Sequence, residues 1–394
     1  MKPAAILDIG SCKIVVLCGS PVNKDGITVH GVAVCPYDGY RDGEFVDEKK
    51  LHATVIEAIQ LAEQRCRTRI REIAVSVPTP FVRLITSEAT VPVSSRSHRV
   101  SAQEIDDLIS ESLKHARAAG HVLMHSTPVS FTVNGVESAE VPEGRRADEI
   151  SGLVSHMYVR EDFVKLIEST LSAIGVEITM CVSAQLCESL LIIPEEERVR
   201  PAVLIDVGYT HTDIAIVENA ALTATASLDI GGMHFASDLS FALEIPLEAA
   251  EQVKRRYGFG QEALSNTEII RMPTGAIRVE RAVIEMIMEA RANELIELMK
   301  KTLIRFGVHP ESYTTTYLTG GGFCMMKGAC EYLKRMLALP VKRDMPYMPE
   351  MNSPNYTSAF GALDFVLRAA GEETEQADVT VASVVDKIKE LFIK

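Results

Sequence analysis

Residues 5–15 read Ala-Ile-Leu-Asp-Ile-Gly-Ser-Cys-Lys-Ile-Val, and residues 202–216 read Ala-Val-Leu-Ile-Asp-Val-Gly-Tyr-Thr-His-Thr-Asp-Ile-Ala-Ile. Each stretch is an apolar strand that ends in Asp-(Ile/Val)-Gly, then a short polar turn and a second apolar strand. Glycine lets the backbone approach a ligand closely, and hydroxyl and amide groups in the turn can then hold phosphate oxygens. One such turn is an ordinary hairpin. Two of them, about one domain length apart, indicate a duplicated nucleotide clamp.

The two turns supply candidate residues for phosphate and for a metal ion. The candidate phosphate-binding residues, four from each turn, are Gly10, Ser11, Cys12, Lys13, Gly208, Tyr209, Thr210 and His211. Asp8 and Asp206 end the two strands, so they would face each other across the clamp. Mg²⁺ is usually bound by one or two carboxylates together with water and phosphate oxygens. We therefore expect Asp8 and Asp206 to hold a hydrated Mg²⁺.

Two further glycine turns follow in the second half of the chain. Residues 228–232 (Leu-Asp-Ile-Gly-Gly) precede a helical pattern that begins near Met233, and residues 316–323 (Thr-Tyr-Leu-Thr-Gly-Gly-Gly-Phe) lead to a helix near 326–337. A glycine turn that enters a helix leaves free amides at the helix N-terminus, where anions bind. These turns add the candidate ligand-binding residues Gly231, Gly232, Gly320, Gly321, Gly322 and Phe323.

With these four turns in this order, the chain resembles the actin/Hsp70/sugar-kinase superfamily and, within it, the FtsA family of bacterial division proteins. Residues 39–47, of the form Gly-x-x-x-Gly-x-x-x-Asp, and residues 359–363, Ala-Phe-Gly-Ala-Leu, also resemble family elements. The resemblance implies an α/β, two-lobed actin-like ATPase fold that binds ATP and Mg²⁺. It also implies that Glu251 and Lys254 contact the adenosine, whereas their spacing alone is typical of a solvated helical pair.

The second phosphate turn departs from the family pattern Asp-Ile-Gly-Gly-Gly-Thr. Tyr209 and His211 stand within it, and their bulk is expected to hinder close approach of the backbone to phosphates. Neither phosphate turn contains an obvious general base, so we predict no catalytic residue. Any ATP hydrolysis would be slow and regulatory.

Residues 80–160 form a predicted insertion. Ser101-Ala102-Gln103-Glu104 is a capping box that opens a helix through about Ala119, and strand-like segments surround it. This α+β module resembles the SHS2-type subdomain 1C of FtsA, which PilM also carries. The implied division is 1–79 and 161–193 as subdomain 1A, 80–160 as 1C, 194–232 and 315–370 as 2A, 233–314 as 2B, 371–380 as a linker, and 381–394 as a C-terminal helix.

The predicted C-terminal helix differs in charge from the rest of the chain. Its three lysines outnumber one Asp and one Glu, giving +1, whereas the whole chain carries −14 and the remainder therefore −15. Apolar residues recur on one face of this segment, and such an amphipathic helix can lie in a membrane surface. The membrane-contacting candidates are Val384, Val385, Ile388, Leu391 and Phe392. Packing of this helix on its own globule or on a partner is the alternative.

Composition excludes several function classes. A net charge of −14 argues against nucleic-acid binding, and no apolar run approaches the length of a transmembrane helix. The eight cysteines form no Cys-x-x-Cys motif, so neither a disulfide framework nor a zinc site is expected. His121 and His125 have helical metal-pair spacing, but their surroundings predict a strand.

We therefore predict an ATP-binding cell division protein, peripheral on the cytoplasmic face of the membrane at the septum. By its resemblance it would form actin-like filaments, bind the C-terminal peptide of FtsZ through subdomain 2B, and meet other division proteins. The candidate peptide-binding residues are Arg271, Arg278, Arg281 and Arg291. The alternatives are a PilM-like platform protein of a type IV pilus or secretion system, and a small-molecule kinase of the same superfamily.

Overall fold

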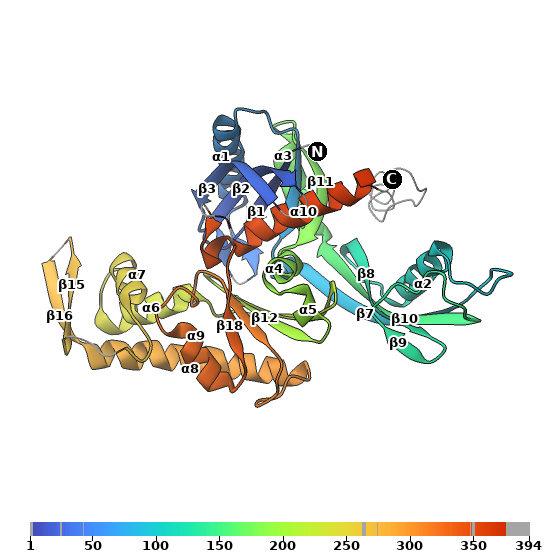
Figure 1. Ribbon diagram of the computed structural model, residues 1–394. Helices are drawn as coiled ribbons and strands as arrows, with labels where there is room; N and C mark the ends of the chain where they lie inside the picture. The colour runs from blue at the N-terminus through green and yellow to red at the C-terminus, as the bar shows by residue number, and fades with distance from the viewer. Residues whose placement is uncertain are drawn as a thin grey trace.

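Two five-stranded sheets with the same connectivity form the centre of the computed structural model (Figure 1). The structure describes residues 3–23, 26–41, 43–261, 265–273, 275–346, 348 and 351–375. The first sheet has the order β11-β6-β1-β2-β3 and contains β1 (Ala4–Ile9), β2 (Lys13–Asn23), β3 (Gly26–Pro36), β6 (Glu72–Val77) and β11 (Glu177–Ser183). The second has the order β18-β17-β12-β13-β14 and contains β12 (Ala202–Val207), β13 (Thr212–Glu218), β14 (Ala221–Leu228), β17 (Thr316–Thr319) and β18 (Val341–Arg343).

The pairing directions are also the same in both sheets. An antiparallel meander of three strands is followed by two strands that run parallel to the first. The quoted stretches at 5–15 and 202–216 occupy equivalent places, at the central strand and its hairpin. The predicted duplication and the actin-like α/β fold are confirmed.

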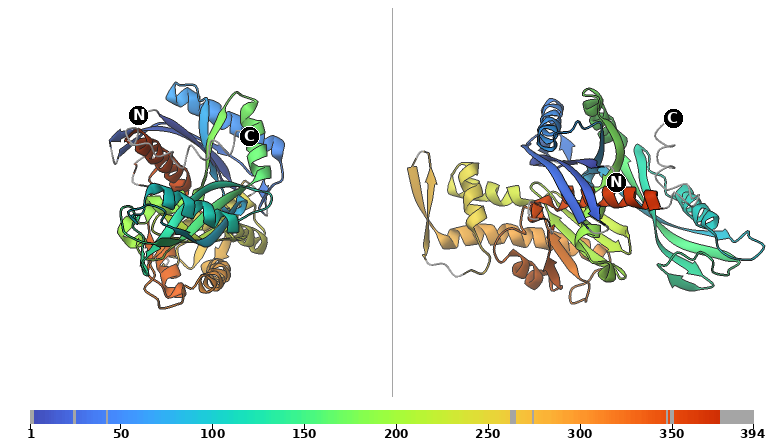
Figure 2. Two further views of the ribbon diagram at one scale, coloured as in Figure 1. Left: turned by 90° about the vertical axis from the view of Figure 1, so that its right-hand side faces the viewer. Right: turned by 45° about the horizontal axis from the view of Figure 1, so that its top comes forward.

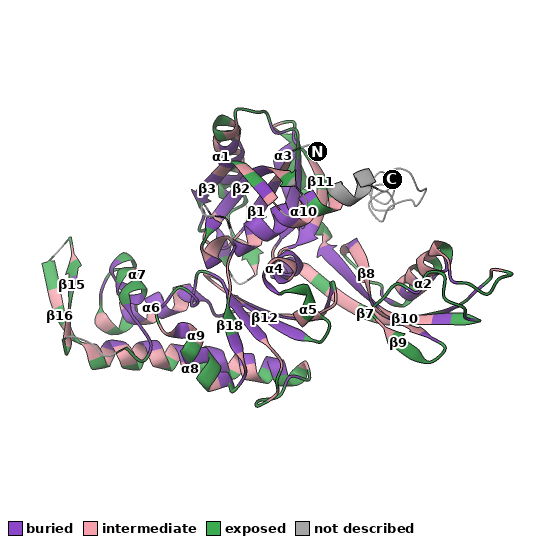
Figure 3. Cartoon of the chain, in the orientation of Figure 1, coloured by how far each residue is buried: buried purple, intermediate pink, exposed green. Residues whose placement is uncertain are grey.

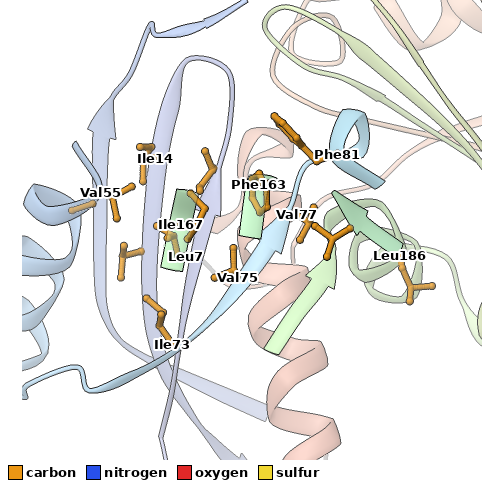
Figure 4. Packing of buried hydrophobic residues seen from close by; sticks show 14 of the residues in the cluster. Leu7, Ile14, Val55, Ile73, Val75, Val77, Phe81, Phe163, Ile167 and Leu186 are labelled. Carbon is orange, nitrogen blue, oxygen red and sulfur yellow. The ribbon is translucent and has the colours of Figure 1, made fainter. Parts of the chain in front are cut away.

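Helices cover both faces of the first sheet, which explains why its central strand is a nearly continuous apolar run. Leu7 and Ile14 face α1 (Glu48–Cys66) and α3 (Glu161–Ser172), as Figure 4 shows. Ile6 and Val15 point the other way, toward Phe360 of α10 (Thr357–Glu375). α4 (Ala184–Ile192) lies beside α10, and α5 (Glu195–Arg198) then leads into the second sheet.

One face of the second sheet packs with the helices of its own lobe into a separate core, whereas Leu204, Ala215 and Tyr317 on the other face belong to the core of the first sheet. These helices are α6 (Gly232–Leu243), α7 (Leu247–Arg256), α8 (Arg281–Arg305) and α9 (Ala329–Leu337). The two-stranded hairpin of β15 (Thr267–Met272) and β16 (Gly275–Glu280) extends from this lobe, at the left of Figure 1. Buried residues concentrate in the two sheets, whereas exposed residues line the hairpin and the outer helix faces (Figure 3).

The predicted insertion forms a separate antiparallel sheet of order β7-β10-β8-β9 with one helix packed on it. Its elements are β7 (Val82–Pro92), α2 (Ala102–His115), β8 (His121–Val133), β9 (Val136–Ser138) and β10 (Glu149–Arg160). The capping box of Ser101 and Glu104 opens α2 as predicted, and the segment of His121 and His125 is a strand. The module projects to one side of the molecule in Figures 1 and 2.

The C-terminal helix α10 continues to Glu375, although a linker was predicted from residue 371. Glutamates and alanines favour helix, so the acidic stretch extends α10 instead of ending it. The predicted amphipathic helix 381–394 lies outside the described residues. None of the helices in the described ranges has the length and apolar content that crossing a membrane requires.

Candidate functional site

A cavity of about 700 Å³ lies where the carboxyl ends of β1 and β12 meet. This volume is within the usual range for small-molecule sites, about 300–1,000 Å³. Residues from all four glycine turns were predicted to bind the ligand. Residues from three of these turns line the cavity. The predicted site residues that line the cavity are Asp8, Gly10, Ser11, Cys12, Lys13, Asp206, Gly208, Tyr209, His211, Glu251, Lys254, Gly320, Gly321 and Gly322.

Four predicted ligand-binding residues lie behind the cavity wall. Phe323 is buried in the core of the second lobe, with its ring 5.1 Å from that of Phe259 and 5.9 Å from that of Phe235. Thr210, Gly231 and Gly232 also do not line the cavity. The sequence pattern could not separate Thr210 and Phe323 from cavity-lining residues, because each stands next to one in the chain. Gly231 and Gly232 share the glycine pattern of the turns that do line the cavity.

Gly231 and Gly232 support the second phosphate turn from behind. The amide of Gly232 donates to the carbonyl of Gly208 at 2.9 Å, and a Cβ at Gly232 would lie 2.5 Å from Cα of Gly322. Three backbone segments therefore pack against one another at this point, and only glycine permits the approach.

The two phosphate turns contact each other directly. The backbone amide of Thr210 donates to Ser11 Oγ at 3.3 Å, which joins the two lobes across 199 residues of sequence. Lys13 Nζ donates to the carbonyl of Asn355 at 2.5 Å and lies 4.1 Å from the ring centre of Tyr356. Burial lowers the pKa of Lys13, and nearby acidic groups oppose this shift. The first turn is thus held by both lobes.

Four carboxylates line the floor of the cavity: Asp8, Glu188, Asp206 and Asp213. Burial raises the pKa of Asp8, partly offset by Ser358 Oγ, which donates to Asp8 Oδ1 at 2.5 Å. Burial and the neighbouring Asp213 raise the pKa of Asp206 to about 7. Burial next to Asp206 also raises the pKa of Glu188. This concentration of acid is costly unless protons or a cation neutralise it.

The carboxylates fit a divalent cation that also binds a phosphate. Asp206 Oδ1 and Asp213 Oδ1 are buried without a hydrogen-bond partner among the described residues. Within the same ranges, no three His, Cys, Asp or Glu side chains are arranged to hold a metal by themselves. A Mg²⁺ held by Asp8 and Asp206 would therefore complete its shell with water or phosphate oxygens, as this ion commonly does.

Glu251 and Lys254 form a buried ion pair at the other end of the cavity. Lys254 is 4% exposed; its Nζ lies 2.6 Å from Glu251 Oε2 and donates to the Gly232 carbonyl at 2.9 Å. Arg255 donates to the other oxygen of Glu251 at 2.8 Å. Burial lowers the pKa of Lys254, and Glu251 opposes this shift. The pair is therefore part of the cavity wall and differs from a solvated surface pair.

The side chains that depart from the family pattern stand at the cavity wall. His211 Nε2 lies 3.4 Å from Asp213 Oδ2, and Thr210 Oγ1 is 3.1 Å from His211 Nδ1. Burial alone would lower the pKa of His211, but Asp213 and the other nearby carboxylates raise it overall. The centre of the imidazole lies 5.8 Å from that of the Tyr40 ring.

The four arginines predicted to bind a peptide do not form one cluster. Arg291 is paired with Asp238 through two bonds of 2.6 and 2.8 Å, and with Glu294 at 2.7 Å. Arg281 is paired with Glu285 at 3.1 Å. Arg271 and Arg278 are exposed on the β15–β16 hairpin, without an ion pair to a described residue. The predicted membrane residues Val384, Val385, Ile388, Leu391 and Phe392 lie outside the described residues.

Several cavity residues carry no sequence motif. Gln185 and Glu188 come from α4, and Asn355 and Ser358 come from the segment that begins α10. They reach the cavity because the two helices cross beneath both phosphate turns. Asp213 could have been found from the sequence, since it is the first charged residue of the strand that follows the second turn.

In the sequence comparison, FtsA proteins match this chain along nearly its whole length. The family model for "Cell division protein FtsA" matches residues 203–361. Cell division protein FtsA of Pseudomonas aeruginosa is 25% identical over 401 residues, covering 97% of this chain and 95% of that protein. FtsA of Bacillus subtilis is 23% identical over 375 residues, covering 92% and 83%.

Structural comparison identifies the fold as actin-like. A PilM-PilN type IV pilus biogenesis complex matches with a TM-score of 0.64 and 18% identity, covering 92% of this chain and 98% of that one. MreB5 of Spiroplasma citri bound to ADP matches with a TM-score of 0.54 and 12% identity, covering 94% and 99%. At these identities the structural likeness concerns the fold.

Proposed function

We propose that this chain, an FtsA-like member of the actin-like superfamily, binds Mg²⁺-ATP between its lobes and acts in bacterial cell division. The observation that carries the proposal is the convergence of both phosphate turns, a third glycine turn and two strand-end aspartates on one cavity. The MreB5 structures with ADP and with AMPPNP support a nucleotide as the ligand of this fold. When bound, Mg²⁺ supplies positive charge to the phosphates.

Each part of the cavity has a separate task in this proposal. Ser11 offers its hydroxyl and Lys13 its ammonium to phosphate oxygens, and Asp8 and Asp206 hold Mg²⁺. Gly10 and Gly208 shape the two turns, with their amides bonded to the carbonyls of Lys13 and His211. Glu251 and Lys254 bind the adenosine. Any hydrolysis would be slow and regulatory, and the nucleotide would chiefly hold the lobes together.

A calorimetric titration with Mg²⁺-ATP tests this assignment. Wild type should bind saturably, and Asp206→Asn should bind at least about tenfold more weakly, because it removes one of the two charged cation ligands. Asp107→Asn on α2 makes the same chemical change on the exposed module and should leave the affinity unchanged. Absence of saturable binding by wild type would refute the nucleotide assignment.

The division role rests on the FtsA likeness and on the charge distribution along the chain. We propose that the C-terminal segment 381–394 attaches to the membrane, that the body forms filaments, and that subdomain 2B binds the FtsZ C-terminal peptide at the septum. A helix with a net charge of +1 binds lipid weakly by itself. Filament formation would present many such helices together and increase avidity.

Co-pelleting with anionic liposomes tests the attachment. The full chain should pellet and a chain ending at residue 380 should not. Equal pelleting of both would exclude the terminal helix as anchor.

A PilM-like platform role is the second candidate, favoured by the TM-score of 0.64 to the PilM-PilN complex. The sequence relatives favour the division role. Co-sedimentation with FtsZ, and separately with a PilN-type pilus peptide, discriminates the two. Binding to the pilus peptide alone would reverse our assignment.

A further inference from the structure

A continuous group of aromatic rings connects the second phosphate turn to the base of the inserted module. It begins at His211, whose ring centre is 5.8 Å from that of Tyr40. Tyr40 contacts Phe45 at 5.4 Å and Phe81 at 6.0 Å, and Phe45 stacks on Phe81 at 5.1 Å with an interplanar angle of 9°. Tyr40 and Phe45 pair across the short hairpin of β4 (Tyr40–Arg41) and β5 (Glu44–Phe45).

Tyr40 is buried in this group, yet its hydroxyl makes no hydrogen bond to a described residue. An unpaired buried hydroxyl normally costs about 1–3 kcal/mol. A phenylalanine at position 40 would avoid that cost. We therefore attribute the role of Tyr40 to its ring and not to its hydroxyl. The ring is tilted by 52° to the His211 imidazole, and Tyr40, unlike His211, does not line the cavity.

We propose that Tyr40 is a positioning residue of the ligand site: its ring holds the His211 imidazole against Asp213 and keeps it out of the space that phosphates occupy. The inference rests on the proposed nucleotide function. This positioning would explain how the second phosphate turn, with a bulky histidine in place of glycine or threonine, retains a cavity of about 700 Å³.

Among the described residues, the ring contact of His211 is with Tyr40 alone. Its polar neighbours are Asp213, at 3.4 Å from Nε2, and Thr210, at 3.1 Å from Nδ1, both in the same turn and strand. A change of the side-chain torsion would break both contacts and move the ring into the cavity. In this proposal, the packing of the Tyr40 ring on the imidazole opposes that movement.

The hairpin that carries Tyr40 is itself fixed at its other strand. Glu44 accepts bonds of 2.7 and 3.3 Å from the Arg160 guanidinium, which lies 5.1 Å from the centre of the Phe81 ring. Arg160 ends β10, and Phe81 precedes β7, so both belong to the base of the inserted module. Phe81 also packs on Phe163 at 4.8 Å (both are labelled in Figure 4). The hairpin that carries Tyr40 is therefore held by contacts with the base of the inserted module.

Equilibrium titration with Mg²⁺-ATP on a set of variants tests the proposal. Tyr40→Phe keeps the ring and should bind as wild type does. Tyr40→Leu keeps most of the volume without the ring and should bind about tenfold more weakly. Phe45→Leu is the matched control, because it disturbs the same cluster without contacting His211; it should lower the melting temperature similarly and change the affinity less than about twofold.

The double variant tests whether Tyr40 acts through His211. Tyr40→Leu combined with His211→Ala should bind no more weakly than His211→Ala alone, because the ring that obstructs the cavity is gone. Additive losses in the double variant, or wild-type affinity in Tyr40→Leu, would overturn the proposal. An equal loss in Phe45→Leu would also overturn it, by showing a general packing effect. If Tyr40→Leu fails to fold, Tyr40→Met takes its place.

A second readout does not need a nucleotide. In protein labelled with ¹³C at histidine ring carbons, the His211 resonance should move in Tyr40→Leu and stay in place in Phe45→Leu, since the Tyr40 ring current is lost only in the first. An unmoved resonance in Tyr40→Leu would refute the positioning role, even if wild type binds no Mg²⁺-ATP. Failure of the proposed function and failure of this inference therefore give different results.

Discussion

His156 is a buried histidine in the inserted module with both ring nitrogens bonded. Ser112 Oγ lies 2.9 Å from Nε2 and Ser126 Oγ 2.7 Å from Nδ1, so the ring joins α2, β8 and β10. Burial lowers its pKa to about 4. The folded state therefore prefers the neutral ring, and its contribution to stability is complete above about pH 6.5 and is lost as the pH falls toward 4.

We predict that acidification destabilises the protein through this residue. Between pH 7.5 and pH 5, the unfolding free energy of wild type should fall by about 2 kcal/mol more than that of His156→Gln. Denaturant unfolding at the two pH values measures the difference. Because His125 is also buried with a pKa of about 4, His125→Gln serves as a separate comparison. A His156→Gln variant with the full wild-type pH dependence would contradict the assignment.

Gly320 has the most restricted surroundings of the glycines in the cavity wall. Its φ is +90°, and a Cβ there would lie 1.9 Å from Asp206 Oδ1 and 2.4 Å from the Val207 carbonyl. We expect Gly320→Ala to lower stability by about 3 kcal/mol or more, since both backbone strain and a clash oppose it. Gly135→Ala is the control, with φ of +75° and open space; it should cost about 1 kcal/mol. Thermal unfolding of both variants measures the two losses of stability. Equal losses would show that the clash predicted at Gly320 does not destabilise the protein.

At this scale the sequence predicted residues that belong to motifs and missed residues that do not. Asp8 and Asp206 were visible because each ends an apolar strand before a glycine turn. Glu188 was not visible, because a single acid on an apolar helix usually lies at the surface. Phe323 stands next to a lining glycine in the chain, but its side chain turns into the core, and no local pattern indicates that direction.

Glu104 stabilises the start of α2 with both of its oxygens. The amide and hydroxyl of Ser101 donate to Oε2, and the hydroxyl and amide of Ser94 donate to Oε1. Bonds from Ser101, and also those from Ser94, lower the pKa of Glu104 to about 2 although burial opposes the shift. This stabilisation is present above about pH 4.5 and is lost as the pH falls toward 2.

We predict that Glu104→Gln lowers the unfolding free energy by about 1–2 kcal/mol at pH 7, because the charge-assisted bonds weaken. The loss should shrink when both proteins are measured at pH 3. Glu111→Gln, on the exposed side of α2, should change stability by less than about 0.5 kcal/mol. If Glu104→Gln were as stable as wild type at neutral pH, the capping role would be wrong.

Element boundaries were less predictable than element types. Strand-like segments were predicted around the helix of the insertion, and those that follow the helix first form one strand, β8, which is continuous through Pro128. Its register against β10 shifts there, from Leu153 opposite Ser130 to Val154 opposite Pro128. A bulge places the proline where no ladder amide is needed. The pairing partner that permits this lies more than twenty residues away and cannot be seen from the local sequence.

At the scale of the whole molecule, the repeated strand-turn stretch predicted two lobes, each with its own sheet, and the position of the cleft. The repeated stretch could predict these features because both lobes contain the same supersecondary unit. The lobes' mutual placement depends on contacts between distant residues, such as the Thr210 amide on Ser11 Oγ and the Lys13 ammonium on Asn355. These bonds have no periodicity or motif, so sequence reasoning could not provide them.

The same placement makes the cleft acidic, and this predicts how nucleotide binding depends on metal. Asp8, Glu188, Asp206, Asp213 and Glu251 face Lys13, Lys254 and Arg255 around one cavity, with His211 between them. ATP adds about four negative charges to this arrangement at neutral pH, so free ATP should be repelled by the carboxylate floor.

Mg²⁺-ATP should therefore stabilise the whole molecule, and ATP in excess EDTA should not. At a hundredfold excess over the dissociation constant, binding contributes about 2.7 kcal/mol to the unfolding free energy. For a chain of this size that corresponds to a rise of about 3–6 °C in the melting temperature. Asp206→Asn should lose most of the rise with Mg²⁺-ATP, because it removes a cation ligand that connects the second lobe to the phosphates. An equal rise with and without EDTA would show that the carboxylates do not act through a metal, and would reassign Asp8 and Asp206 to a structural role.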